Sequence, residues 1–287
     1  MKTQRIHKIT LRWLAVALGL CLVVASAVLA QQEEWNELNQ QALKLYQQGK
    51  SAEAIPIGQR ALEFAEKTFG PNHANVAKTL DNLARVYEAQ RKYAEADLLY
   101  KRSLAIREKA LGPDHLDVAN SLDNLARVYG KQRKDAEAEP LYKRSLAIRE
   151  KALGPDHPDV GRSLNMLALV YASQRKYAAA EPLFKRSLAM REKTLGPDHP
   201  EVPTSLDSLA RVYEAQRKYA EAEPLFKRSL AMREKTLGPD HPEVANSLDN
   251  LARVYEAQRK DAEAEPLYKR SLAIREKAQG PEHPAVA

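Results

Sequence analysis

Apolar residues recur with helical spacing along most of the chain. In the stretch 158–174 they fall at positions i, i+4, i+7, i+8 and i+11, on one face of an α-helix: Val160, Leu164, Leu167, Ala168 and Tyr171. The proline at position 158 is a favourable first helical residue. The pattern therefore predicts a helix that begins at Pro158 and ends near Gln174.

A second helical pattern follows at about residues 177–195. Its apolar side chains form two neighbouring lines: Ala180, Phe184 and Leu188, and Leu183, Ser187 and Met190. Two lines suit a helix that packs against its own partner and against a further helix. Gly196 is expected to close this helix in the left-handed conformation, and Pro197 prevents its continuation. Nothing in this region alternates with period two, so we expect no β-sheet.

The same pair of patterns returns at a constant interval along the chain. Gly-Pro pairs mark each interval: Gly70-Pro71, Gly112-Pro113, Gly154-Pro155, Gly196-Pro197, Gly238-Pro239 and Gly280-Pro281. They delimit five 42-residue repeats: 71–112, 113–154, 155–196, 197–238 and 239–280. A degenerate first repeat occupies 31–70, and 281–287 match the truncated start of another. This self-similarity predicts one helix pair stacked on copies of itself, not a set of globular domains.

Prolines also stand inside the second helix of four repeats, near its start: Pro140, Pro182, Pro224 and Pro266. Because proline donates no backbone hydrogen bond, we expect an irregular opening turn there and not a broken helix.

The segment 1–30 differs from the repeats. Four basic residues come first: Lys2, Arg5, Lys8 and Arg12. An apolar run over 13–30 follows, with Val28 and Ala30 at the small-residue positions of a cleavage site. This order is typical of a secretory signal peptide, which predicts an exported protein, periplasmic or secreted. The length of the run keeps an uncleaved inner-membrane anchor over 13–30 open as the alternative.

The charge balance changes when this segment is set aside. The whole chain has 45 basic and 38 acidic residues and carries +7. The segment 1–30 removes four basic residues and no acidic ones, so the net charge of the remainder falls to +3. Basic residues are not concentrated in one part of it, so we do not expect nucleic-acid binding. The single cysteine, Cys21, lies in the apolar run, so a cleaved protein would contain no disulfide.

The stretch 213–255, YEAQRKYAEAEPLFKRSLAMREKTLGPDHPEVANSLDNLARVY, resembles a tetratricopeptide repeat. The small and large residues typical of that family are present in the fifth repeat: Leu251, Ala252, Tyr255, Ala264 and Tyr268. The strings EPLYKRSLAIREKALGPDHPDV and SLDNLARVY resemble the 42-residue kinesin light chain subtype, which also occurs in bacterial proteins. The resemblance covers about residues 35 to 280.

Two features depart from that subtype. Arg91 and its equivalents replace the usual turn glycine, and an export signal stands in place of the coiled coil, which argues against motor transport. The resemblance implies an all-α solenoid of antiparallel helix pairs wound into a right-handed superhelix. It also implies that the first helices line a concave groove that binds peptides.

Histidine is the residue that first suggests chemistry. Beyond the segment 1–30 it occurs only in the repeated Gly-Pro-x-His turns: His73, His115, His157, His199, His241 and His283. Copies translated along a solenoid do not converge on one metal or one reacting atom. We therefore expect a structural role for them, no catalytic residues, no metal site and no cofactor.

The groove that the resemblance implies is lined by first-helix residues opposite the apolar stripe. These are Asp81, Asn82, Arg85, Asp123, Asn124, Arg127, Asp207, Arg211, Asn246, Asp249, Asn250 and Arg253. Asparagine can donate and accept hydrogen bonds with a peptide, and arginine can hold a carboxylate bidentately. The alternative is a solvated face in which Asp81–Arg85 and the equivalent pairs form i, i+4 ion pairs.

The third repeat breaks this pattern, because Asn165, Met166 and Leu169 replace its neighbours' polar and charged residues. An apolar spot of this kind can take a partner's hydrophobic side chain. Lys78, Asn82 and Asn124 also resemble the start of the carboxylate clamp by which some tetratricopeptide domains hold a chain terminus. Arg162 matches only one of its two later basic positions, since Met166 stands at the other.

We therefore expect a non-catalytic protein–protein interaction scaffold that binds a peptide or helical segment in the concave groove. The alternative is a structural module that multimerises or spaces a membrane-associated complex through its ends. Self-association through the C-terminal repeat belongs to that alternative, although Gln279 replaces the leucine of earlier repeats. Membrane contact is expected only through the N-terminal segment, if it is not cleaved.

Overall fold

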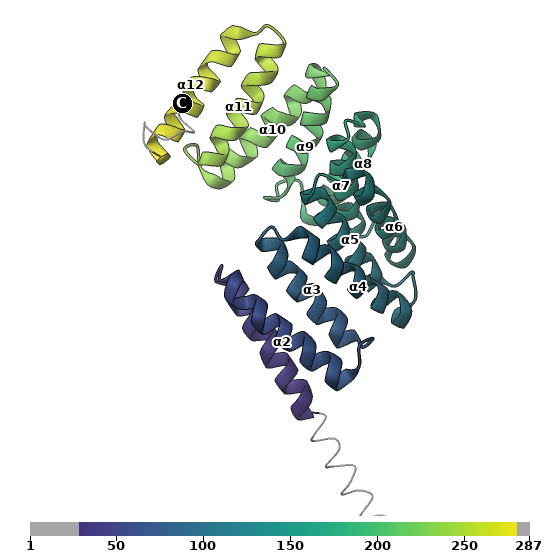
Figure 1. Ribbon diagram of the computed structural model, residues 1–287. Helices are drawn as coiled ribbons and strands as arrows, with labels where there is room; N and C mark the ends of the chain where they lie inside the picture. Colours follow the sequence, from purple (N-terminus) through teal and green to yellow (C-terminus); the bar gives the residue numbers. More distant parts are fainter. Residues whose placement is uncertain (1–28, 280–287) are drawn as a thin grey trace, which may run out of the picture. The chain divides into compact units, whose positions relative to one another are not determined.

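The computed structural model describes residues 29–279 (Figure 1). The predicted signal segment, apart from its last two residues, and the truncated repeat with His283 lie outside the described residues. All regular structure within 29–279 is helical, which confirms the predicted all-α class. No helix in that range is both long enough and apolar enough to cross a membrane.

The chain divides into two compact units, residues 1–132 and 133–287. The described part of the N-terminal unit holds a helix over 29–47 and four more: α2 (Ser51–Phe69), α3 (Ala74–Ala89), α4 (Tyr93–Leu111) and α5 (Leu116–Lys131). Helix α3 packs between α2 and α4, and α4 packs against α5. The division at residue 132 falls between the two helices of the repeat 113–154.

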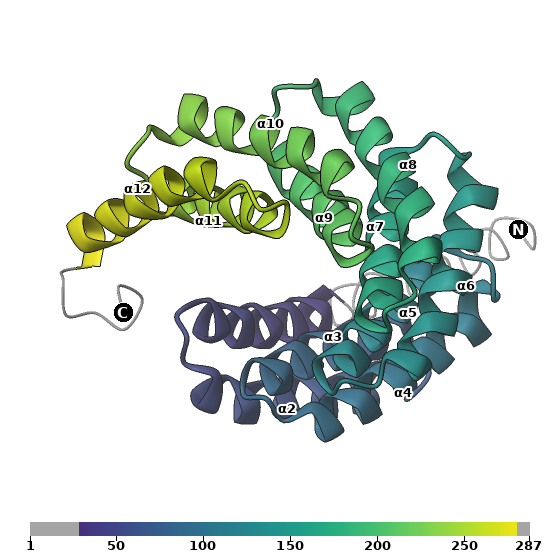
Figure 2. The same cartoon turned by 90° about the horizontal axis from the view of Figure 1, so that it is seen from above.

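The C-terminal unit holds α6 (Asp135–Leu153), α7 (Pro158–Ser173), α8 (Tyr177–Leu195), α9 (Val202–Ala215), α10 (Tyr219–Leu237), α11 (Pro242–Ala257) and α12 (Asp261–Gln279). They follow one another in chain order (Figure 2), and among α6 to α11 each packs against the next. Helix α12 packs against α11. Antiparallel helix pairs, one pair per repeat, are therefore the building block, as predicted.

A histidine begins most of the first helices. The Nδ1 atom of His157 accepts a hydrogen bond from the backbone N–H of Asp159 at 3.2 Å, and Pro158 follows as the first helical residue. His73, His115, His199 and His241 accept the equivalent bond at 3.1–3.2 Å. The imidazole thus satisfies one of the N–H groups left unpaired at a helix start.

The turn between the two helices of a repeat contains an arginine in the left-handed region. Arg91, Arg133, Arg175, Arg217 and Arg259 have φ of 58–62°, and Gly49 of the first repeat has φ 75°. For a residue with a Cβ this conformation costs about 1 kcal/mol. The position is therefore a glycine position that five repeats fill with arginine.

Gly196 differs from the expectation. Its φ is 92°, but its ψ is 153°, so it ends α8 in an extended conformation open to glycine and not in the left-handed helical one. The second helices do continue through their prolines, since α6, α8, α10 and α12 each run 19 residues with the proline inside.

The predicted apolar stripe forms the core. Val160, Leu164 and Ala168 are fully buried and Leu167 nearly so, while Tyr171 is half-buried. One continuous cluster of buried side chains extends from Ala168 to Ile274 through the C-terminal unit. Burial of small residues such as Ala168 and Ala180 lets neighbouring helices approach closely, which the alternation of small and large residues predicts.

Candidate functional site

The five described turn histidines hold the backbone of their turns. In each of them, Nδ1 accepts a hydrogen bond from a backbone N–H group. In four of them this bond caps the following helix, whereas α9 begins three residues after His199, at Val202. Residues 29–279 contain no group of three His, Cys, Asp or Glu side chains placed to hold a metal ion.

The first-helix aspartates do not face a groove, which corrects the sequence-based expectation. Asp81 and Asp207 are buried, and Asp249 is half-buried. Asp81 pairs with Arg107 and Asp207 with Arg233, each at 2.7 Å, and Asp249 pairs with Arg275. Each partner lies on the second helix of the same repeat, so the expected i, i+4 pairs with Arg85, Arg211 and Arg253 are replaced.

These arginines also bind serines on the helices around them. The guanidinium of Arg233 donates to the Ser229 hydroxyl at 2.7 Å and to the Ser247 hydroxyl of the next repeat at 2.8 Å. Arg107 contacts Ser103 and Ser121 in the same way. Hydroxyls and a carboxylate together compensate the desolvated charge, so this polar cluster belongs to the interior.

Two of the predicted asparagines are buried as well. Asn82 donates to the Asn39 side chain at 3.3 Å, and Asn250 is 6% exposed. Asn124 is half-buried and accepts from Arg127 at 3.3 Å, whereas Asn246 is exposed and accepts from Arg275 at 3.2 Å. The expectation that Asn82 and Asn250 face outward is therefore wrong, because both are buried and Asn82 is bonded to the helix over 29–47.

The predicted arginines remain at the surface, but they differ in their partners. Arg127 pairs with Glu88 of the preceding repeat, and Arg253 pairs with Glu214 at 2.9 Å. Arg127 also donates to the Tyr100 hydroxyl at 3.3 Å, and burial raises the pKa of Tyr100 to about 12. Each arginine–glutamate pair joins positions in consecutive repeats, with the same separation of 39 along the chain.

Arg85 and Arg211 are exposed and form no ion pair within residues 29–279. The reason for Arg211 is visible in the sequence. At the same separation before Arg211 the chain has Ala172, where Glu88 and Glu214 stand in other repeats. The third repeat thus leaves the arginine of its successor without a carboxylate.

Helix α7 of the third repeat carries an uncharged surface. Leu169 is 43% exposed, and Met166, Asn165 and Ala172 are half-buried. No charged residue occurs on this helix after Arg162, which is exposed and pairs with Asp159 at 3.3 Å. We call Met166, Leu169 and Ala172 the α7 apolar face.

Lys78, the remaining predicted residue, is exposed, and its ammonium lies 5.2 Å from the centre of the Trp35 ring. Within the N-terminal unit, Lys78 and Asn82 therefore contact the first repeat. This contact accounts for Lys78 without a ligand.

Open hollows lie where the first helices of successive repeats end. In the N-terminal unit one is lined by Tyr46, Arg85, Glu88, Ala89, Arg91, Tyr93, Arg127 and Lys131. In the C-terminal unit another is lined by Arg211, Glu214, Ala215, Tyr219, Arg253, Glu256, Ala257 and Arg259. Each unit thus brings two of the predicted groove arginines together with an arginine of the Gln-Arg-Lys turns.

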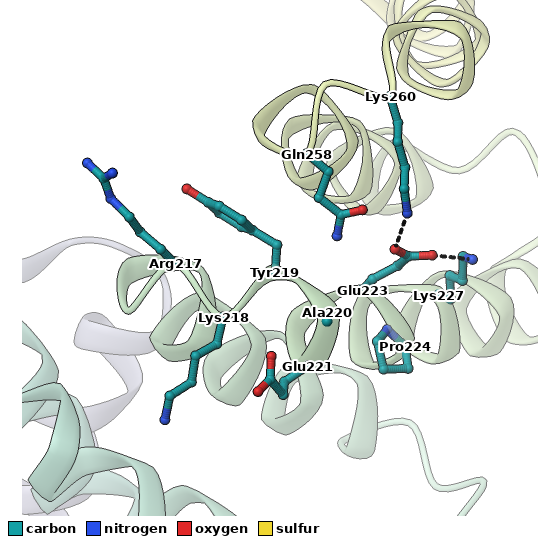
Figure 3. A pocket seen from close by; sticks show the side chains of 10 residues that line it. All are labelled: Arg217, Lys218, Tyr219, Ala220, Glu221, Glu223, Pro224, Lys227, Gln258 and Lys260. Atoms are coloured by element: carbon teal, nitrogen blue, oxygen red, sulfur yellow. Dashed lines mark hydrogen bonds and ion pairs between the residues drawn. The ribbon is translucent and has the colours of Figure 1, made fainter.

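A second recurring cluster, which sequence reasoning missed, joins consecutive repeats. Glu223 accepts from Lys227 of its own helix at 2.7 Å and from Lys260 of the next repeat at 3.0 Å (Figure 3). The two ammonium groups lie 5.5 and 5.4 Å from the ring of Tyr255. Glu139 and Glu181 have the same environment. A regular spacing of Glu, Lys and Tyr across repeats was its only sequence signal.

The cluster keeps its glutamates ionised. Hydrogen bonds from Lys143 and Lys176 lower the pKa of Glu139 to about 2. Lys185 and Lys218 lower the pKa of Glu181, and Lys227 that of Glu223, also to about 2. Because the environment repeats along the chain, it indicates a fastening between repeats and not a single reactive site.

Helix pairs of constant length, fastened to one another by equivalent contacts, define a helical repeat protein. The tetratricopeptide repeat family matches at residues 35–109, 99–151, 131–193, 170–235 and 215–277, and the chain belongs to that family. The matching family is that of a repeat and not of an enzyme. Among curated proteins, none matches the chain.

Solved structures agree with this family. One of them is a Podosopora anserina protein described as a kinesin light chain, which consists of nearly identical TPR-like repeats. Its sequence is 32% identical to this chain, and the match covers 72% of this chain and 98% of that chain (TM-score 0.65). BtubC (BKLC) from P. vanneervenii is 21% identical over 90% and 94% of the two chains (TM-score 0.65). PilF of Pseudomonas aeruginosa is 20% identical over 90% and 96% (TM-score 0.59). The kinesin light chain-like subtype is thus confirmed.

Proposed function

We propose that this protein is a non-catalytic scaffold that binds a peptide or helical segment of another protein along its first helices. The observation that carries the proposal is the α7 apolar face next to an arginine without an ion pair. Leu169 is 43% exposed on α7, and Arg211 stands at the equivalent position of α9. A contiguous apolar patch with a polar rim is typical of a protein-binding surface, and Leu169 lies on one helix face with Met166 and Ala172.

The two features complement one another chemically. A hydrophobic side chain of the partner would pack on Met166 and Leu169, and the loss of its water-exposed area would supply most of the affinity. Arg211 would hold a carboxylate or a backbone carbonyl of the same segment and fix its direction. In the N-terminal unit, exposed Arg85 offers a second contact of the same kind.

The repeats themselves supply a conservative test. Met166→Asn with Leu169→Arg gives α7 the residues that α5 and α11 already carry, so the variant is expected to fold. We expect it to lose the partners that wild-type protein captures in a pull-down from the exported fraction. Lys235→Glu is the control, because its side chain is 73% exposed at the end of α10. A partner set unchanged in the double variant would refute the proposal.

Arg211→Glu alone, with the α7 apolar face intact, separates the two contributions. Reversal of the charge should weaken capture of a segment that carries a carboxylate and leave a purely apolar partner bound. The comparison therefore shows whether the partner places a carboxylate or an apolar side chain against α9.

A second candidate function is assembly through helix α12. Its Tyr268 and Leu272 are 37% and 40% exposed, whereas the equivalent Phe226 and Leu230 of α10 are 0% and 9% exposed. We propose light scattering over a range of concentrations as the test. A mass that grows with concentration and returns to the monomer in Leu272→Lys would favour assembly, and a constant monomeric mass would exclude it.

We also propose that the chain is exported, on the basis of the basic and apolar order of residues 1–30. Cell fractionation with a C-terminal tag tests it. A shortened protein outside the inner membrane supports cleavage after Ala30, a full-length membrane-bound protein supports the anchor, and cytoplasmic protein refutes export.

A further inference from the structure

The turn between the two helices of a repeat has the sequence Gln-Arg-Lys, and its glutamine and lysine form hydrogen bonds with the preceding repeat. In the C-terminal unit, Lys218 donates to Glu181 at 3.0 Å and Gln216 donates to the same carboxylate at 3.2 Å. Lys176 and Lys260 bind Glu139 and Glu223 in the same way. Both outer positions of the turn therefore fasten it to the preceding repeat.

The arginine between these two residues does not bind the preceding repeat in this way. Arg133, Arg175, Arg217 and Arg259 are exposed and form no ion pair within residues 29–279. Most other arginines of the described chain have a carboxylate partner, as Arg186, Arg228 and Arg270 do. Arg85 and Arg211 on the first helices also form no ion pair within this range, but only the turn position lacks one in all four repeats of the C-terminal unit.

That position is also the one where the backbone disfavours an arginine. All four have φ of 59–62°, the left-handed region that glycine adopts freely, and Gly49 occupies it in the first repeat. A residue in a disfavoured backbone conformation whose charged group forms no ion pair with the fold points to a role for that group outside the fold. Glycine would suit this backbone better, so the guanidinium group is the property for which arginine stands here.

We propose that Arg133, Arg175, Arg217 and Arg259 form a docking row for an extended acidic segment of a partner protein, one carboxylate per repeat. The row follows from the fold, since equivalent ion pairs fasten each repeat to the next and so place the turns in sequence. Neighbouring turns are then about 10 Å apart, the distance of packed helices. A segment in the extended polyproline II conformation rises about 3.1 Å per residue with three residues per turn. Acidic residues at every third position then lie on one side, about 9 Å apart, and fit the row.

A sparse acidic peptide fits better than a denser polyanion because acidic side chains stand between the arginines. Glu221 and Glu223 line the same hollow as Arg217. In Figure 3, Arg217 extends away from both of them and from the Lys227–Glu223–Lys260 cluster. Phosphates at every position would meet these carboxylates, whereas acids at every third position would meet only the arginines. The row lies at the turns and the α7 apolar face lies on a helix, so the inference goes beyond the proposed function, although Arg259 of the row lines one hollow with Arg211.

Fluorescence anisotropy on the full chain tests the row with a labelled peptide in which glutamate occupies every third position and Gly and Ser fill the rest. The variant Arg175→Gly/Arg217→Gly/Arg259→Gly restores the residue that the backbone prefers. We expect it to bind at least about tenfold more weakly while its melting temperature does not fall. The melting temperature thereby distinguishes a loss of binding caused by unfolding from one caused by removal of the arginines.

Three comparisons complete the test. Met166→Asn/Leu169→Arg should bind the peptide as wild type does. Arg→Lys at the same three turns should keep most of the binding, and a peptide with its glutamates contiguous should bind several-fold more weakly. The proposal is overturned if wild type does not bind the spaced peptide, if the glycine variant binds it equally well, or if single-stranded DNA or phosphatidylglycerol vesicles bind more tightly through the same arginines.

Discussion

His157 shows how a residue associated with catalysis can serve the backbone. Its place in a Gly-Pro-x-His turn predicted a structural role, and the hydrogen bond from Asp159 N–H to Nδ1 defines that role. The sequence did not indicate which atom would act, because histidine is not among the usual capping residues. Five described repeats with the same bond establish the histidine as the cap of this turn.

We predict that His157→Ala lowers the free energy of unfolding by about 1 kcal/mol, since the Asp159 N–H loses its acceptor. His157→Asn should restore most of the loss, because asparagine is a preferred cap. Urea denaturation followed by circular dichroism measures both. Equal stability of the alanine and asparagine variants would contradict the capping role.

The aspartates show where residue-level reasoning failed. The i, i+4 spacing of Asp81 and Arg85 predicted a surface ion pair, yet Asp81 is buried against Arg107. Spacing along one helix identifies possible partners on that helix only, and a partner on the following helix depends on how the two helices pack. The sequence did contain a signal, since an arginine recurs at the position of Arg107 in later repeats.

Arg191 offers a test of this cluster, because the third repeat has Asn165 where the others have aspartate. Its side chain is 19% exposed and retains Ser205 and Glu201 as partners. Asn165→Asp should therefore raise the free energy of unfolding by about 1 kcal/mol, as a carboxylate meets a largely buried guanidinium. Arg191→Leu in the same background should abolish the gain; a gain that survives it would have another origin.

At the scale of the helices, the sequence predicted bounds and pairing well. The expected helices 158–174 and 177–195 match α7 and α8 to within a residue. Periodicity and Gly-Pro turns are local signals, and helices depend mainly on local signals. The Glu–Lys–Tyr fastening was missed because its members come from two helices and a turn of consecutive repeats.

We predict that this fastening weakens in acid. The pKa of Glu181 is lowered from 4.5 to about 2, so its contribution to stability is complete above pH 4.5 and is lost as the pH falls towards 2. Because the lysines are half-exposed, screening limits that contribution to about 1 kcal/mol. Glu181→Gln should be less stable than wild type at pH 7 and equally stable near pH 2, measured by thermal denaturation across that range. A difference that persists at pH 2 would mean that charge is not its cause.

At the scale of the whole molecule, the constant spacing of the Gly-Pro turns predicted a repeat array correctly. It did not predict which first-helix residues would be free for a partner. That property depends on the preceding repeat, as Ala172 and Arg211 show, so it had to be judged across two repeats at once. Leu169 and Met166 could be identified from sequence because they depart from their own equivalents.

We predict that deletion of 197–238 leaves a folded helical protein. Lys260 would then meet Glu181 and Arg270 would meet Glu192, because the lost residues are replaced by equivalent ones. Only Arg253 would lose its carboxylate, since Ala172 replaces Glu214. Helical content per residue should stay unchanged by circular dichroism. Deletion of 197–234, which is out of step with the period, should lower it; equal helicity in both would contradict the argument.

The fastening between repeats also has a consequence for how such a gene can change. The lysine–glutamate bonds across the boundaries all join positions with the same separation along the chain, whichever two repeats meet. Unequal crossing-over between copies would therefore exchange, add or remove whole repeats without creating a mismatched boundary. The third repeat, with its uncharged α7, could be moved along the array in this way and leave the arginine of a new successor unpaired, so that a new arrangement of contacts would arise in a single genetic event.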